Sequence, residues 1–150
     1  MVKLPSSEQF WRFCLEHYPG LQQPLLRLQD DVGANVNVLL LLLYAEQHRW
    51  HWSAAEITRL HQAVQPVNQQ VTLPIRLLRR QLSEQPTIKS SLLQAELAAE
   101  QLEQQALLAA LPEPTAGKAA DLIRDYLTQL APSTERWQQT LFDLRQSQAR

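Results

Sequence analysis

Polar side chains crowd against the most apolar run of the chain, five consecutive leucines at residues 39–43. The polar members are two aspartates and three amides: Gln29, Asp30, Asp31, Asn35 and Asn37. Carboxylate and amide oxygens can hold Mg²⁺ or Ca²⁺, and they can equally bind a polar small molecule. If the chain has a ligand site, we expect it to include this stretch.

The spacing of the two aspartates argues against a metal ion. Neighbouring helical residues point about 100° apart, so Asp30 and Asp31 do not chelate one ion from a regular helix. The structural alternative is that Asn35 caps a helix and Asn37 is satisfied within the core. If the helix that contains Asp30 runs on without a sharp turn, helical spacing also brings Asp30 towards Asn37 over the small Ala34. Arg76 or Arg79 could then complete a buried Arg–Asp–Asn network. An unpaired buried amide would cost about 1–3 kcal/mol.

Three arginines later in the chain form a second candidate cluster. Arg76 shares a helix face with both Arg79 and Arg80, and such a cluster can grip a phosphate or carboxylate bidentately. The alternative is pairing with nearby acids such as Glu84, four residues after Arg80. The candidate ligand-binding residues are therefore Gln29, Asp30, Asn37, Arg76, Arg79 and Arg80.

A third candidate is the aromatic segment from His48 to Trp52. Its His-x-x-His spacing lacks the four ligands of a structural zinc site, so no metal or other cofactor is predicted. Trp50 and Trp52 either pack over the core or form an exposed patch for a protein partner, because tryptophan is enriched at interface hot spots.

Standard catalytic motifs are missing: there is no Gly-rich phosphate loop, nucleophile elbow or Cys/His dyad. No catalytic residue is predicted, and the leading hypothesis is a non-enzymatic interaction or regulatory module that uses an aromatic or arginine surface. The alternative is a small-molecule binder or enzyme that uses Gln29, Asp30 and Asn37 with an arginine. A deep pocket on which these side chains converge would favour the alternative.

Composition indicates one cytoplasmic domain. The chain has 150 residues, 45% of them apolar, and a net charge of −1 that gives no reason to expect nucleic-acid binding. The lone Cys14 fits a reducing compartment and is expected to be buried as a small apolar side chain. The apolar run at 36–45 is far shorter than the about 20 residues that a membrane span needs, and no signal peptide is recognised.

Apolar periodicity predicts an all-α bundle of about seven or eight helices around a central helix at about 36–47. Capping boxes begin helices at Ser6 and Ser53, Gly33 ends one, and the tail should fray from about 146. The helix that begins at Ser6 is expected to end at Pro19-Gly20, and the next begins near Pro24. The helix that begins at Ser53 is expected to end before Pro66. Further helices are expected over about 66–84 with a kink, over 88–111, over 116–130 and from 132 onward. On 88–111, with Thr87 as cap, the predicted buried seam is Ile88, Leu92, Ala95, Ala99, Leu102, Ala106 and Ala109.

Three segments carry a resemblance to a known family: Tyr18-Pro19-Gly20, the Leu28-Gln29-Asp30…Gly33…Val36–Leu40 order, and Pro74–Arg80. Over roughly residues 8–115 the chain resembles a family of uncharacterised proteobacterial all-helical proteins, a domain of unknown function. The resemblance implies the helical fold and a bacterial cytoplasmic protein, and it implies no mechanism.

Overall fold

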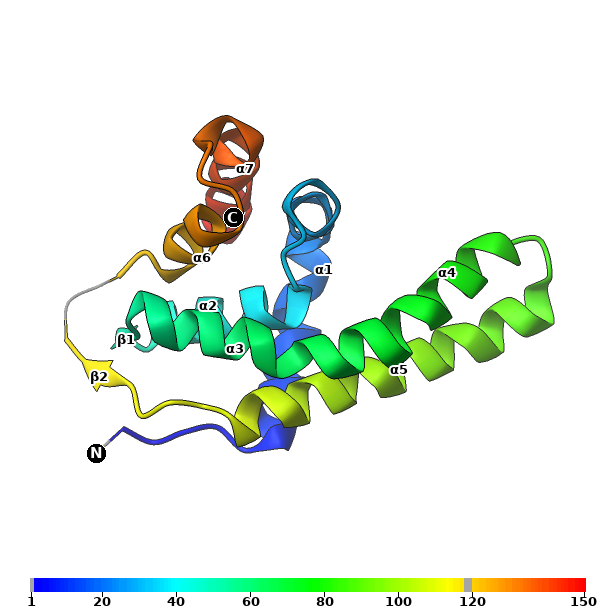
Figure 1. Ribbon diagram of the computed structural model, residues 1–150, viewed down its shortest axis with the longest axis horizontal. Coiled ribbons are helices and arrows are strands. Elements are labelled where there is room, and N and C mark those ends of the chain that lie inside the picture. Colours follow the sequence, from blue (N-terminus) through cyan, green and yellow to red (C-terminus); the bar gives the residue numbers. More distant parts are fainter. Residues whose placement is uncertain (1, 118–119) are drawn as a thin grey trace.

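The computed structural model describes residues 2–117 and 120–150 as a single all-α domain with one short sheet (Figure 1). Its elements are α1 (Ser7–Val32), α2 (Val36–Gln47), β1 (Trp50–His51), α3 (Ala54–Val67), the π-helical turn η1 (Asn68–Thr72), α4 (Leu73–Gln81), α5 (Pro86–Ala109), β2 (Thr115–Ala116), α6 (Leu122–Leu130), the 3-10 turn η2 (Thr134–Arg136) and α7 (Gln138–Gln148). Among the described residues, no helix is long and apolar enough to cross a membrane.

The central helix is confirmed as α2. Gly33 ends α1 in the left-handed conformation at φ 74°, which glycine adopts without strain. Asn35 then caps α2, because its Oδ1 accepts the backbone N–H of Val38 at 3.0 Å. Residues 38–43 are all buried, with α1, α5 and α6 packed around them. The Gly33–Asn35 link thus fixes the point where the polar stretch enters the core.

The prediction that a helix ends at Pro19-Gly20 is wrong, since α1 is continuous through Pro19 and Pro24. Each proline removes one donor, leaving the carbonyls of Leu15 and Gly20 without their usual helical partner. Both residues are exposed, so water can bond these carbonyls. The buried positions Phe10, Cys14, Leu21, Leu25, Leu28 and Val32 keep one helical phase across both prolines.

The helix α3 does not end before Pro66 either, and α3, η1 and α4 form one continuous helical rod. The turn η1 widens the rod just before Pro74, where the Leu73 N–H bonds to the Asn68 carbonyl five residues back. This widening relieves the clash that a proline ring makes with the carbonyl four residues earlier. The predicted kink is therefore a π-helical turn, and it places Asn68 beside α5.

The buried face of α5 is polar, which corrects the predicted alanine–leucine seam. Ile88 and Leu102 of that seam are exposed, and Gln85 rather than Thr87 is the N-cap. The residues that α5 buries are Glu96, Ala99, Glu103, Gln104 and Leu107. With α4, the first half of α5 extends away from the other helices as an arm (Figure 1).

The aromatic segment is part of the core. Trp50 is 3% and Trp52 0% exposed, so of the two alternatives the tryptophans pack in the core, and the candidate partner-binding patch at these residues is wrong. Trp50 lies in β1, which pairs antiparallel with β2, where a helix from 116 was expected. Residues 118–119 of that expected helix lie outside the described residues, and α6 begins at Leu122. Cys14 is buried as predicted.

Candidate functional site

A cavity of about 500 Å³ lies between α1, α2 and the α4–α5 pair. Its apolar wall comes mainly from α1 and α5 and its polar wall from α2, α4 and α5. Five of the six predicted ligand-binding residues line it, namely Gln29, Asn37, Arg76, Arg79 and Arg80. Asp30 is not among the lining residues and is exposed on α1. Segments distant in sequence thus converge on one cavity.

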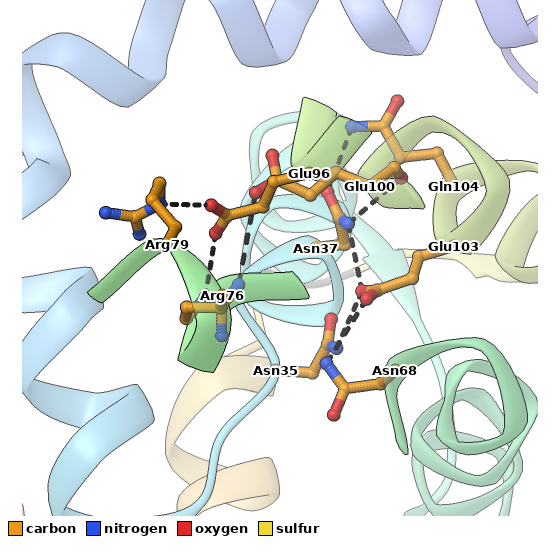
Figure 2. Close-up of polar contacts among 9 residues, drawn as sticks. All are labelled: Asn35, Asn37, Asn68, Arg76, Arg79, Glu96, Glu100, Glu103 and Gln104. Carbon is orange, nitrogen blue, oxygen red and sulfur yellow. Dashed lines mark hydrogen bonds and ion pairs between the residues drawn. The ribbon is translucent and has the colours of Figure 1, made fainter. Parts of the chain in front are cut away.

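The centre of the polar wall is the carboxylate of Glu103, which is 2% exposed. Three amide side chains donate to it, as Figure 2 shows: Asn35 at 2.9 Å and Asn37 at 3.1 Å to Oε1, and Asn68 at 3.2 Å to Oε2. These donors come from the start of α2 and from the π-helical turn. Both oxygens of Glu103 are therefore engaged inside the protein.

Asn37 uses its whole amide in this wall. Its Nδ2 donates to Glu103 and to the backbone carbonyl of Glu100 at 3.2 Å, and its Oδ1 accepts from Gln104 Nε2 at 3.0 Å. The buried network predicted at Asn37 exists, but the partners predicted for Asn37 are wrong. They come from α5, whereas Asp30 and the arginines make no hydrogen bond to Asn37 among the described residues.

Replacing Asn37 with leucine should lower the free energy of unfolding by about 1–3 kcal/mol, because Gln104 and Glu103 each lose a buried partner. Urea unfolding followed by circular dichroism measures this change. The exposed amide Gln101 of α5 serves as the control, and Gln101→Leu should change stability by less than about 0.5 kcal/mol. An unchanged or raised midpoint for Asn37→Leu would contradict the network.

Arg76 and Arg79 are turned towards α5, where both bind Glu96. The Nε of Arg76 lies 2.9 Å and the Nε of Arg79 2.6 Å from the two carboxylate oxygens of Glu96 (Figure 2). These two ion pairs hold the pKa of Glu96 below its usual range, although burial alone would raise it. Arg76 and Arg79 therefore pair with an acid of another helix, while Arg80, which also lines the cavity, is exposed.

Glu100 is the least satisfied carboxylate in the cavity. Its nearest cation is the Arg76 guanidinium, 3.9 Å away, and its carboxylate accepts no hydrogen bond from the described residues. Its side chain is 33% exposed and lines the cavity. Burial, together with the neighbouring negative charge of Glu96, raises the pKa of Glu100 to about 7.

This raised pKa predicts how stability depends on pH. Between about pH 4.5 and 7 the folded protein still holds a proton on Glu100 that the unfolded chain has released. The free energy of unfolding therefore falls as the pH rises through this range. Glu100→Gln should therefore be more stable than the native protein at pH 8 by about 1–2 kcal/mol, allowing for solvent screening, and nearly equal at pH 4.5. Urea midpoints at the two pH values measure this, and a pH-independent difference would contradict it.

The acidic and amide residues of α5 were not predicted as site residues. Glu96, Glu100 and Glu103 fall at i, i+4 and i+7, which puts three carboxylates on one helix face. That spacing was the available signal, and it was missed because charged positions on a long helix usually face solvent. The lining residue Cys14 accepts from Gln104 at 3.4 Å, and burial raises the pKa of its thiol to about 12, which makes it a poor nucleophile.

Comparison with known proteins gives a family and no activity. No curated protein and no solved structure matches the chain. A family model described as "Protein of unknown function (DUF2390)" matches residues 9–107, a range that runs from the start of α1 into the last turn of α5. That range contains every residue of the polar wall described above. The chain belongs to the DUF2390 family.

Proposed function

We propose that this protein binds a small amphipathic organic molecule in the cavity between α1, α2 and the α4–α5 pair. The observation that carries the proposal is the cavity itself, whose volume of about 500 Å³ falls within the usual range of small-molecule sites. Five residues singled out by sequence pattern line it. This is the result expected of a binding protein rather than of a module that binds through an aromatic or arginine surface.

The two kinds of lining suit an amphipathic molecule. Apolar side chains from α1, α2 and α5 offer a surface for a hydrocarbon or ring: Trp11, Leu15, Leu26, Val36, Leu40, Leu93 and Leu97. The amides and carboxylates of the polar wall offer polar groups to the same cavity. Convergent polar groups in a mainly apolar pocket orient a ligand and give specificity, while burial of its apolar part provides affinity.

Titration with the neutral apolar dye N-phenylnaphthylamine tests the proposal, because its fluorescence rises when it leaves water. The dye should bind the native protein saturably with one site. Leu97→Asp, which places a charge in the apolar wall, should weaken dye binding about tenfold. Leu102→Asp is the matched control, because Leu102 is exposed on the same helix but does not line the cavity. Absence of saturable binding, or equal loss in both variants, would contradict the proposal.

A protein-interaction role is the second candidate, favoured by the leucines exposed on the α4–α5 arm. These are Leu73, Leu77 and Leu78 of α4, with Ile88, Leu93 and Leu97 of α5. Large apolar side chains exposed on neighbouring helices are typical of association surfaces. This role is tested by comparing the sedimentation of the native protein with that of a Leu77→Lys, Leu78→Lys variant. A complex that forms through the arm should be present in the native protein and lost in the variant.

A further inference from the structure

We propose that the molecule bound in this cavity is an alkyl amine whose ammonium group pairs with Glu100 and whose hydrocarbon chain lies along the apolar wall. This inference rests on the proposed function, because it names the chemical class of the ligand of that site. It is drawn from the charges of the polar wall, from the position of Glu100, and from the aromatic residues that line the cavity.

The charges of the polar wall do not balance. The α5 face carries three carboxylates, Glu96, Glu100 and Glu103, whereas the cations in contact with them are the guanidiniums of Arg76 and Arg79. Both arginines bind Glu96, and the three donors to Glu103 are neutral amides. With all three carboxylates ionised, this cluster is one positive charge short. An uncompensated charge in a partly buried place is unfavourable, and a monovalent cation removes that cost.

Glu100 is the group positioned to receive that cation. Hydrogen bonds within the protein already engage both oxygens of Glu96 and both oxygens of Glu103. The carboxylate of Glu100 lines the cavity with only a 3.9 Å ion pair to Arg76. An ammonium group has three donors and no acceptor, so it complements a carboxylate that has free lone pairs.

The groups that face Glu100 come from three helices. They are Glu96 and Glu103 on α5, Arg76 and Arg79 on α4, and Cys14 and Tyr18 on α1. Glu100 contributes to raising the pKa of both Tyr18 and Cys14, after the larger effect of their burial, so these neighbours stay neutral. Trp11 and Tyr18 also line the cavity, and aromatic rings attract cations. Arg80 also lines the cavity, but it is exposed to water that screens its charge, and it forms no ion pair with these carboxylates among the described residues.

The experiment compares three probes that share one hydrocarbon chain: n-octylamine, octanol and octanoate. The affinity of each probe is measured by its displacement of N-phenylnaphthylamine at pH 8, where Glu100 is ionised and octylamine is protonated. Octylammonium should bind at least fivefold more tightly than octanol, and octanoate should bind most weakly. Glu100→Gln should remove this preference for octylammonium, whereas the exposed Glu84→Gln control should retain it. Circular dichroism confirms that both variants are folded.

Two further comparisons identify the source of the ammonium and the role of Glu100. Octylammonium affinity should rise several-fold between pH 5.5 and pH 8 in the native protein, and this rise should vanish in Glu100→Gln. Butylamine, which resembles a lysine side chain, should bind much more weakly than octylamine. If butylamine binds as tightly as octylamine, the ammonium belongs to a partner's lysine and the proposed free amine is overturned.

The remaining outcomes separate this inference from the proposed function. Equal affinity for the three probes, or tightest binding of octanoate, overturns the amine proposal while the cavity remains a binding site. A preference for octylammonium that survives in Glu100→Gln also overturns it. If neither the dye nor any probe binds, the proposed function itself is wrong.

Discussion

Replacing Glu103 with leucine is expected to lower the free energy of unfolding by about 3–5 kcal/mol, the larger of the changes predicted for the polar wall. Glu103 is the common acceptor of three amides, Asn35, Asn37 and Asn68, and leucine accepts from none of them. Stranding two buried donors and a partly buried one at once costs more than the loss of one pair. The effect should be large because Glu103 is only 2% exposed.

Urea unfolding followed by circular dichroism measures this loss, and Glu103→Gln is the informative companion. Glutamine keeps one acceptor oxygen at nearly the same position, so its cost should be roughly half that of leucine. The exposed acid Glu84 provides the matched surface control, where leucine should be almost neutral. A change below about 1 kcal/mol in Glu103→Leu would mean that the three amides do not depend on this carboxylate.

Truncation of Trp52 to alanine is the second large effect, also expected at about 3–5 kcal/mol. The side chain is fully buried, and its Nε1 donates to the Pro112 carbonyl at 3.1 Å, so alanine leaves both a cavity and an unpaired acceptor. Thermal unfolding measures the loss against Phe142→Ala, an exposed aromatic that should change stability little. Equal effects of the two truncations would contradict a core position for Trp52.

Local signals in the sequence were enough to predict many helix ends. The capping boxes at Ser6 and Ser53, the Asn35 cap and the Gly33 end are set by residues within one turn of each other. The central helix was predictable because residues 38–43 are apolar around the whole helix. These features depend on neighbours along the chain, and tertiary packing leaves them unchanged.

The prolines show where local reasoning fails. Pro19 and Pro66 predict helix ends because each removes a donor, yet both lie inside continuous helices. The loss of one bond is small beside the burial of an apolar stripe that keeps its phase on both sides, as it does from Cys14 to Leu21. Tracking the phase across the proline would have predicted the longer helix.

The candidate site was half predictable. Asn37 and the arginines could be recognised because they break the local apolar or neutral pattern. Their partners were missed although Glu96, Glu100 and Glu103 share one helix face, because the hydrophobic period of that helix pointed to another face. A carboxylate becomes a core residue only when donors from other segments meet it, and that meeting is set by the tertiary fold.

The central claim, that a small molecule occupies the cavity between α1, α2 and the α4–α5 pair, is tested most directly by the indole N–H signals of the tryptophans. The chain has four, and Trp11 alone among them lines this cavity, whereas Trp50 and Trp52 are buried elsewhere and Trp137 lines a surface groove near α7. In a titration with N-phenylnaphthylamine followed by proton–nitrogen correlation spectra, the Trp11 signal should move saturably while the other three stay in place. Movement of Trp137 instead, or no movement of Trp11 at saturating dye, would contradict the account.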